Sequence, residues 1–484
     1  MSLVSPLVWF LPLVLIRFNE NKSLLYTSVD AKGDMVIFLS RLIPDFIKTR
    51  LEGRKTLQRV IKNSGWMFFD KVFRMGVGFF VAVWVTRYLG PERFGLLSYS
   101  TAFVSLFAAV ANLGLYGIVV RDIIRYPGNR EEIIGTALFL KCIGGFLCLL
   151  LALVVIFLVR GSDSQVHWLV GIIAAGMIFQ SFDVFDFWFQ SQLQSKYTLF
   201  ANIPGFVIMT IVRITLILLG APLVAFAWAA FFDLLLAGAG LLSAYHLTTK
   251  RLGSLRVNVK WARRLLSDSW PVIFAGLMLM VYSRIDQVMI GQMLDEKSVG
   301  LYAAAVKIAE LWYFFPTLIL NSMLGMIVTA KEEGENIYYH RLQQVFDVMA
   351  IVSYLFILPL ALFSGKIMVF MYGDAYASAA PVLTVYVVSG IFVFLGHTRE
   401  YWVTVENITR FSMYSTAVGA VLNILLNVVL IPAYGNLGAA YATLVSLVMA
   451  GYLVNAFHGK TRRIFGLQTR ALFLVSLFTR LKRA

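Results

Sequence analysis

The chain has 484 residues, of which 59% are hydrophobic and only 14% are charged. Soluble globular proteins contain about 45–50% apolar and about 25% charged residues, so both values exclude an ordinary soluble protein. The formal net charge of +16 does not indicate nucleic-acid binding, because the aromatic residues belong to apolar segments and no nucleic-acid motif is present. We therefore expect a membrane protein with cations in its loops and inside a helix bundle.

Residues 1–60 fit this pattern poorly and are assigned to an N-terminal amphipathic extension. Met1–Ile16 is apolar, but it is too short to cross a membrane and has neither a cationic start nor a small-residue cleavage site. No signal peptide is therefore expected. Met35–Lys62 has the pattern of an amphipathic segment that leads into the first span.

Twelve apolar runs follow, each long enough to cross about 30 Å of hydrocarbon. They cover residues 63–89, 94–120, 132–158, 166–190, 197–219, 221–246, 268–293, 299–329, 341–364, 379–404, 409–431 and 436–458. Glycine- and proline-containing turns separate most of them. The pattern predicts an all-α integral membrane protein with about 12 transmembrane helices.

A short turn occurs twice, once after the first span and once after the seventh. Leu89–Leu96 (LGPERFGL) and Leu294–Leu301 (LDEKSVGL) share Leu, Gly and Leu at a constant offset of 205 residues. Such a repeat predicts two homologous, pseudo-symmetric six-helix lobes, an architecture of transporters. We expect the N-lobe at 61–246 and the C-lobe at 268–459, with both turns serving as scaffolding rather than as substrate contacts.

Two basic segments flank the second lobe. Residues 247–267 carry six Lys and Arg residues and are predicted to form a linker that contains an amphipathic segment lying at the membrane surface. Residues 460–484 form a short amphipathic basic tail, which we also expect at the surface.

The orientation follows from the positive charges of alternate loops. One side of the twelve spans holds 25 Lys and Arg residues and the other holds five. Positive loops stay in the cytoplasm, so both termini, the linker and the tail are predicted to be cytoplasmic. The expected location is the cell (inner, cytoplasmic) membrane, which the chain crosses many times.

Charged residues also lie inside the spans, where placement at the bilayer centre costs about 2.5–3.5 kcal/mol. The cations are Lys71, Arg74, Lys141, Arg213, Arg284, Lys307 and Arg399. The acids are Asp70, Asp183, Asp186, Asp233, Asp286, Glu310, Asp347 and Glu400. At such a cost, each of these side chains is expected to face a partner or an aqueous cavity.

Spacing along the helices separates internal partners from candidate substrate contacts. Asp70 with Arg74, and Lys307 with Glu310, stand four and three positions apart, so each pair shares a helix face. These pairs either lock helices together or face the cavity. Arg74, Arg213 and Arg284 have no acid at such spacing on their own helices apart from Asp70, which favours a role in substrate binding. The predicted substrate-binding cations are Arg74, Arg213, Arg284, Lys307 and Arg399. The predicted coupling acids, which would exchange H⁺ or Na⁺, are Asp70, Asp286, Glu310 and Glu400.

Some polar residues of the spans also have a structural interpretation that involves no substrate. Arg399 and Glu400 lie near the inner end of their span, where long side chains also reach the interface without binding substrate. On the eleventh span Asn423 and Asn427 belong to a polar stripe, which either faces a cavity or holds helices together.

No catalytic constellation is found in the sequence. The five histidines are scattered, no His, Cys or acid cluster has metal-ligand spacing, and no GxxxxGK[ST] phosphate loop is present. We therefore expect a carrier rather than an enzyme, with no metal site and no cofactor.

Three motifs carry a family resemblance: Thr86–Gly95 (TRYLGPERFG), Arg284–Gly291 (RIDQVMIG) and Val299–Lys307 (VGLYAAAVK). Over roughly residues 60–460 the chain resembles the polysaccharide (O-antigen, Wzx-type) flippases of the multidrug/oligosaccharidyl-lipid/polysaccharide (MOP, MATE-like) exporter superfamily. The resemblance implies a MATE-like V of two lobes around a cationic cavity. It also implies alternating-access movement of a polyprenyl-diphosphate-linked oligosaccharide from the cytoplasmic to the outer leaflet. Membrane lipids, a polysaccharide polymerase and glycosyltransferases are the implied partners, with no nucleic acid.

Three other functions are weighed against this one. Lipid II flippases, a sister branch, usually carry two additional helices that are not found here. A multidrug cation antiporter would need a net acidic cavity, whereas seven cations lie within these spans. A scaffold for glycan-assembly enzymes would not depend on the cations inside the bundle.

Overall fold

The computed structural model describes residues 55–161, 163–249, 252–457 and 459–475, with side chains from Lys71 onward except at 322, 324 and 409. The predicted N-terminal extension lies almost entirely outside these residues. The chain divides into two units, Met1–Lys62 and Asn63–Ala484. Of the first unit the structure describes only the opening residues of α3.

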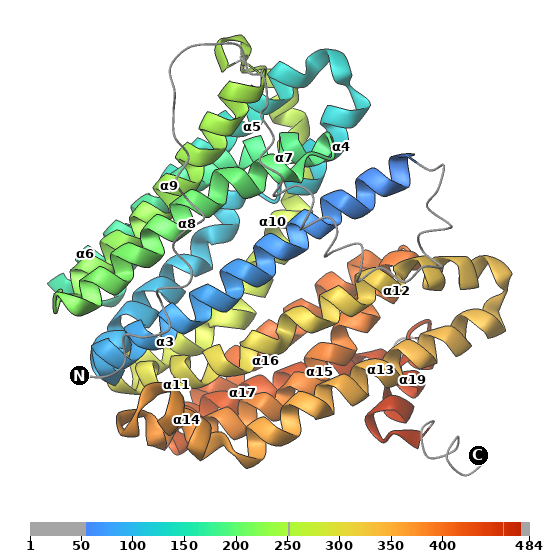
Figure 1. The fold of residues 1–484 in the computed structure, drawn as a ribbon. Coiled ribbons are helices and arrows are strands. Elements are labelled where there is room, and N and C mark those ends of the chain that lie inside the picture. Colours follow the sequence, from blue (N-terminus) through green and yellow to red (C-terminus); the bar gives the residue numbers. More distant parts are fainter. Residues whose placement is uncertain (1–54, 162, 250–251, 458, 476–484) are drawn as a thin grey trace, which may run out of the picture. The chain divides into compact units, whose positions relative to one another are not determined.

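The described residues of the first half form helices joined by short turns (Figure 1). Its elements are α3 (Lys55–Asn112), α4 (Tyr116–Arg125), η2 (Pro127–Asn129), α5 (Arg130–Val159), α6 (Ser164–Gly176), η3 (Met177–Asp183), α7 (Val184–Ser191), α8 (Ser195–Leu218) and α9 (Leu223–Thr249).

The second half continues in the same way, with one π-helical turn, η7. Its elements are η4 (Leu252–Ser254), α10 (Val259–Met293), α11 (Glu296–Glu310), η5 (Leu311–Tyr313), α12 (Phe314–Glu333), α13 (Glu335–Leu362), α14 (Ser364–Tyr372), η6 (Asp374–Ala379), α15 (Ala380–Val405), α16 (Thr409–Tyr434), α17 (Asn436–Val448), η7 (Met449–Leu453), α18 (Val454–Phe457) and α19 (Arg462–Leu472).

Eleven helical ranges in the described part of the chain are long and apolar enough to cross a membrane. The first, Lys71–Arg125, has 55 residues and bends at Gly90, where φ is +70° and ψ is 170°. At 1.5 Å per residue it extends over about 80 Å, enough for two crossings. The eleven ranges therefore agree with the predicted twelve spans.

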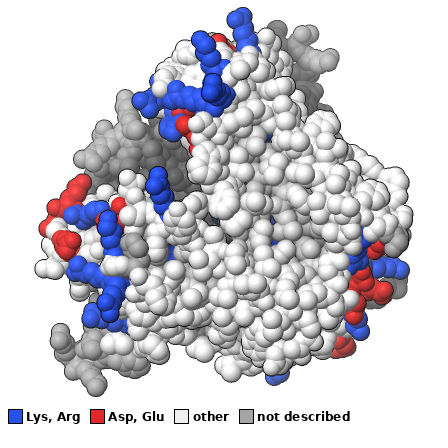
Figure 2. Space-filling model, turned by 180° about the vertical axis from the view of Figure 1, so that it is seen from behind, with Lys and Arg blue, Asp and Glu red and all other residues white. Residues whose placement is uncertain are grey.

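The outer surface of the bundle is apolar where lipid would contact it. On α5, Phe146, Leu150, Val154 and Leu158 stand four positions apart and are between 56% and 81% exposed. Figure 2 shows that on one face the charged residues gather towards the edges and uncharged residues cover the broad middle. Large exposed apolar surfaces are rare on soluble monomers, so this band is a membrane-contacting surface.

The predicted linker runs directly into the seventh span. Helix α10 begins at Val259, inside 247–267, and continues without interruption to Met293. Asn258 caps it by accepting a hydrogen bond from the Lys260 backbone N–H at 2.9 Å. The Asn258 amide also donates to Glu132 of α5 at 2.7 Å. Buried Leu265 packs in a first-half core cluster with Ile118, so the linker and the first turns of α10 are attached to the N-terminal half.

The two repeated turns pack directly against each other. A Cβ at Gly95 would lie 1.7 Å from the carbonyl oxygen of Glu296, and a Cβ at Gly300 would lie 1.9 Å from that of Pro91. Such distances leave room for a hydrogen atom alone. We call this contact of Pro91, Gly95, Glu296 and Gly300 the turn interface. The duplicated glycines are thus explained by a close approach of the two halves.

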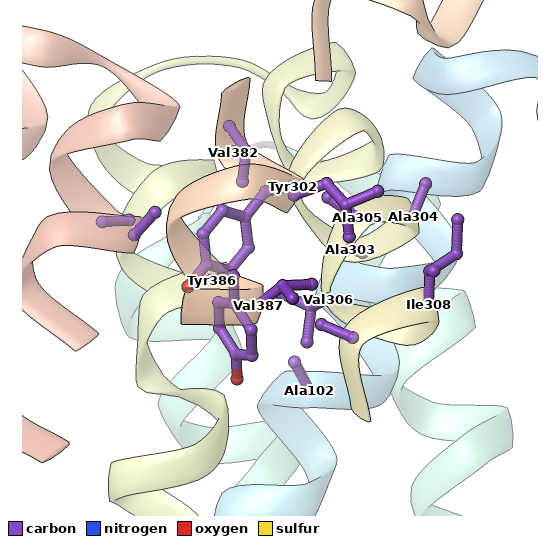
Figure 3. Close-up of a cluster of buried hydrophobic side chains, with 14 of the residues drawn as sticks. Ala102, Tyr302, Ala303, Ala304, Ala305, Val306, Ile308, Val382, Tyr386 and Val387 are labelled. Carbon is purple, nitrogen blue, oxygen red and sulfur yellow. The ribbon is translucent and has the colours of Figure 1, made fainter. Parts of the chain in front are cut away.

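Further contacts flank the turn interface. The guanidinium of Arg160, which follows α5, lies 2.6 Å from Glu296 Oε1 and 4.5 Å from the ring centroid of Tyr99. The Tyr376 hydroxyl of η6 donates to the Thr86 carbonyl of α3 at 2.8 Å. Figure 3 shows Ala102 of α3 among buried side chains of α11 and α15, including Tyr302. The halves therefore share a continuous apolar core beside this interface.

Candidate functional site

Each half of the protein holds an arginine–carboxylate pair between two successive long helices. Arg213 of α8 pairs with Asp233 of α9, and both side chains are partly exposed. Arg284 of α10 pairs with Glu310 of α11 at 3.3 Å, again with partial exposure of both. Neither arginine has an acid three or four positions away on its own helix, but a neighbouring helix supplies one.

Lys307 is the third cation of this region. Its Nζ lies 5.5 Å from the ring centroid of Phe94, a residue of the first repeated turn. The positive charges of Arg213 and Arg284 both act on it. Within the described residues Lys307 forms no ion pair, so three cations face two carboxylates. We call Arg213, Arg284 and Lys307 the cation cluster; the two halves contribute to it together.

Lys307 and Glu310, which stand three positions apart and were considered as a pair, do not form an ion pair with each other in the structure. Glu310 is the last residue of α11, and its carboxylate lies instead against Arg284 and the Tyr386 hydroxyl, at 3.3 Å and 3.4 Å. A lysine–glutamate pair on one helix contributes only a few tenths of a kcal/mol. A charge-assisted hydrogen bond from arginine is stronger, and it determines where this carboxylate lies.

Arg74 lies on α3, beside α8. The adjacent Phe73 packs edge to face with Phe206 of α8, at 6.1 Å between centroids. Phe206 precedes Arg213 by seven residues, which is about 10 Å along α8, so α3 contacts α8 about two turns away from Arg213 at this point. The side chain of Asp70, a predicted coupling acid, lies outside the described side chains.

Arg399 occupies a different place from the cation cluster. It is 4% exposed and sits among α15, α16 and η7. Its guanidinium contacts Glu400, donates to the Ala450 carbonyl of the π-helical turn, and donates to Ser415 Oγ at 3.1 Å. Glu400 also accepts from Ser412. The structure thus holds Arg399 and Glu400 together in a network within the C-terminal half.

Asp286 forms the centre of a second buried network. It is 4% exposed. It accepts hydrogen bonds from Tyr302 of α11 and Asn427 of α16, each at 2.7 Å, and from Thr443 of α17. Asn427 in turn donates to Asn423 at 3.0 Å. Among the described residues Asp286 has no ion-pair partner. The polar stripe of the eleventh span therefore faces other helices, where it surrounds this carboxylate.

Sequence reasoning assigned no role to two residues that the structure places at informative positions. Lys141 of α5 is 2% exposed and lies 3.7 Å from Asp183 Oδ2. Arg160, one of the five cations counted on the less basic side of the spans, contacts Glu296 of the turn interface. A cation that falls at the end of a span just before a turn gives no sequence signal of such a contact. Within the described part of the chain no group of His, Cys, Asp or Glu is arranged to hold a metal.

Comparison with known proteins identifies the family. The sequence profile of the family described as polysaccharide biosynthesis protein matches residues 60–330, more than half of the chain. The chain belongs to this family. A second profile, described as MatE, matches residues 271–429 of this family member. The resemblance drawn from the three motifs is confirmed.

Two relatives are similar to this chain in sequence. The probable low-salt glycan biosynthesis flippase Agl15 of Haloferax volcanii is 25% identical over 80% of this chain and 81% of its own length. The probable flippase AglR of the same organism is 26% identical over 37% of this chain and 38% of its own.

Among solved structures, an inward-facing multidrug resistance MATE family transporter of the MOP superfamily aligns with a TM-score of 0.67 at 16% identity, covering 82% of this chain and 96% of that one. Lipid II flippase MurJ, in an inward closed conformation, aligns with a TM-score of 0.61 at 15% identity, covering 86% and 93%. These similarities show that the fold is that of the MATE-like transporters, with two pseudo-symmetric six-helix lobes in a multi-pass membrane protein.

Proposed function

We propose that this protein is a flippase that moves a polyprenyl-diphosphate-linked oligosaccharide from the cytoplasmic to the outer leaflet by alternating access, as a carrier and not an enzyme. The observation that carries this proposal is the cation cluster, to which both halves contribute inside an apolar bundle. A lipid diphosphate is a dianion attached to a hydrophilic sugar, so it needs cations in the passage while its tail stays in lipid. The relative named as a probable low-salt glycan biosynthesis flippase supports the same substrate class.

The composition of the cluster suits a diphosphate. The planar guanidinium groups of Arg213 and Arg284 match phosphate oxygens and remain charged. In this arrangement Asp233 and Glu310 hold the arginines until substrate arrives, and Lys307 supplies the uncompensated positive charge. Arg74 of α3, whose neighbour Phe73 packs against α8, is proposed as a further substrate contact. Arg399 is proposed to act indirectly, by positioning Glu400.

The direction of transport follows from the proposed orientation. With both termini and the linker in the cytoplasm of a cell whose membrane is negative inside, outward movement of a dianion is downhill. The gain is about 2.3 kcal/mol per charge for each 100 mV. The proposed location is the cytoplasmic membrane, with 61–246 as the N-lobe, 247–267 as the cytoplasmic linker, 268–459 as the C-lobe and 460–484 as the cytoplasmic tail.

We further propose that Asp286 is the residue that couples transport to a cation. Three donors stabilise its charged form in a buried site, where an isolated charge is otherwise costly. The side-chain oxygen of Asn427, buried nearby, has no hydrogen-bond partner within the described residues. Carboxylate, hydroxyl and amide oxygens together suit Na⁺, and the carboxylate alone suits H⁺. Asp70, Glu310 and Glu400 are the other candidate coupling acids.

Replacing Asp286 with asparagine should remove the response of transport to an imposed ion gradient, because a neutral amide neither takes up a proton nor supplies the negative charge that balances a bound Na⁺. Transport by proteoliposomes would be measured with a Na⁺ gradient and, separately, with a pH gradient. The matched variant is Asp374→Asn, which neutralises an exposed carboxylate of η6 that belongs to neither buried network and should keep the response. An unchanged response in Asp286→Asn would transfer the coupling role to another acid.

The chemistry of the proposed substrate indicates which enzymes act before and after the flippase. Glycosyltransferases would build the lipid-linked oligosaccharide on the cytoplasmic side, and a polysaccharide polymerase would consume it on the outer side. Both are proposed partners.

The proposed function is tested with purified protein in vesicles. A polyprenyl-diphosphate disaccharide carrying a nitrobenzoxadiazole group on its sugar is placed in both leaflets, and dithionite quenches what reaches the outside. Protein-containing vesicles should expose more of the probe than protein-free vesicles. Ethidium provides the comparison, since a multidrug cation antiporter would move ethidium and leave the disaccharide lipid in place.

A further inference from the structure

A polar cavity of about 490 Å³ lies between the first turns of α13 and helix α19, away from the cation cluster. Each helix supplies residues three or four positions apart, so each turns one face to the cavity. The lining residues are Asn336, Tyr339, His340 and Gln343 of α13, and Arg463, Gly466, Leu467 and Arg470 of α19. This lining set contains two arginines and a histidine and no carboxylate.

The two arginines of the cavity differ in their contacts. Arg463 lies over the ring of Tyr339, 3.5 Å from its centroid, and its Nη1 is 3.3 Å from Glu335 Oε2. Glu335 is 82% exposed at its side chain, so this ion pair is weak. For Arg470 no hydrogen bond or ion pair is found with any described residue. One guanidinium is therefore held in place by an aromatic ring, and the other is available to a ligand.

Helix α19, which forms one wall of the cavity, is packed against the bundle. Helix α19 was predicted as part of a surface-lying tail, but one of its faces is buried against the bundle, through Ile464, Leu467 and Ala471. Buried Gln468 donates to the Gly451 carbonyl at 3.0 Å, and the Tyr354 hydroxyl of α13 donates to the Leu472 carbonyl at 2.7 Å. The cavity is thus part of the folded C-terminal half.

The contacts of Gln343 define the inner end of the cavity. Its amide donates to Asp347 Oδ1 at 2.7 Å and to the Leu467 carbonyl at 3.3 Å. Asp347 is thereby engaged within α13, and Glu335 is solvated at the other end. The net charge that a ligand meets between them is positive.

The surroundings indicate where the ligand comes from. Directly after α19, Phe473 and Val475 are exposed apolar residues. Exposed apolar side chains next to a basic amphipathic helix are typical of segments at a membrane surface. In the orientation proposed above, this surface is the cytoplasmic leaflet, whose anionic lipids attract clustered Lys and Arg residues.

We propose that this cavity binds the phosphate group of an anionic membrane lipid, with Arg463 and Arg470 as its cationic ligands. Guanidinium groups bind phosphate oxygens through paired hydrogen bonds, and Asn336 and His340 add donors on the opposite wall. The acyl chains would then lie beside Phe473 and Val475. Bound lipid would connect α19 to α13 and stabilise the C-terminal half.

The test uses the full-length protein in uncharged detergent, with its melting temperature as the readout. A ligand that binds the folded state raises this temperature. Phosphatidylglycerol should raise it by several degrees in the wild type, and phosphatidylcholine, which is zwitterionic, should not. The shift should be largely lost in the double variant Arg463→Gln/Arg470→Gln. Arg462→Gln removes the same charge from a residue of α19 that does not line the cavity, so this control should keep the shift.

Two outcomes would overturn the proposal. Equal shifts in the wild type and in Arg470→Gln would exclude the cavity, and this single variant removes no internal contact that folding requires. An equally large shift with millimolar inorganic phosphate would exclude the lipid as the ligand. Because the wild-type flippase assay is not involved, either result leaves the proposed transport function standing.

Discussion

Replacing Lys307 with methionine should abolish glycan export while leaving the folded protein at least as stable as the wild type. Lys307 has no ion-pair partner among the described residues, and the charges of Arg213 and Arg284 repel it. Its removal relieves this repulsion and keeps the length of the side chain. If the positive charge serves the substrate, its loss should lower export at least tenfold, since binding of the dianion weakens by more than about 1.4 kcal/mol.

Both effects are measured in the same variant. Surface glycan is quantified in cells that carry only the variant gene, and the melting temperature is measured on the purified protein. Lys366→Met is the matched control, because Lys366 is exposed and lies near Phe363, outside the cluster. Normal surface glycan in Lys307→Met would show that the cluster does not serve transport. Lower stability with lower export would instead indicate a structural lysine.

The role of the arginine–carboxylate pairs is tested with double variants rather than single ones. Removing Arg284 alone leaves Glu310 as an uncompensated acid, which destabilises a protein whatever the role of the arginine. The double variant Arg284→Gln/Glu310→Gln removes both charges, so neither side chain is left as an unpaired charge. A purely structural pair predicts recovery of export in the double variant. A substrate-binding arginine predicts that export stays low although the protein folds, and Arg213 with Asp233 allows the same comparison.

The sequence predicted the membrane fold because its signals are local. Apolar runs of sufficient length mark the spans, and the Gly90-Pro91 step marks the bend within α3. The start of α10 was not predicted, because Val259–Ser267 is basic. This segment is helical because Asn258 caps it and Leu265 packs on the first half, and a hydropathy pattern contains neither contact.

The placement of the candidate site residues was predicted in part. Arg213, Arg284 and Lys307 were selected from the sequence, and the structure brings them together. Their carboxylate partners were missed or misassigned, because spacing on one helix reveals only neighbours three or four residues apart. Glu310 pairs with Arg284 across 26 residues of chain, and Arg399 with Glu400 lies in a separate network. Such pairings depend on which helix faces which, and that arrangement follows from packing of the whole bundle.

Replacing Gly95 with alanine should hold the two halves apart at the turn interface and lower export at least tenfold. The added methyl group would lie 1.7 Å from the Glu296 carbonyl oxygen, a distance that no packing rearrangement of side chains relieves, because the clash is with backbone. Gly300→Ala should have the same effect through Pro91. Gly76→Ala on the same helix is the control, since nothing lies within 4 Å of its Cβ.

Opening of the turn interface is measured by thiol labelling. Val299 is fully buried beside the interface, so Val299→Cys, with Cys142 and Cys148 replaced by serine and alanine, should label slowly. Added Gly95→Ala should make it label rapidly, and added Gly76→Ala should not. In the proposed cycle the turn interface must separate to release substrate outward and re-form to accept the next one. A variant that labels rapidly and still exports normally would show that re-formation is dispensable. Rapid labelling with lost export would mean that the repeated glycines, although they contact no substrate, are what allows the carrier to close.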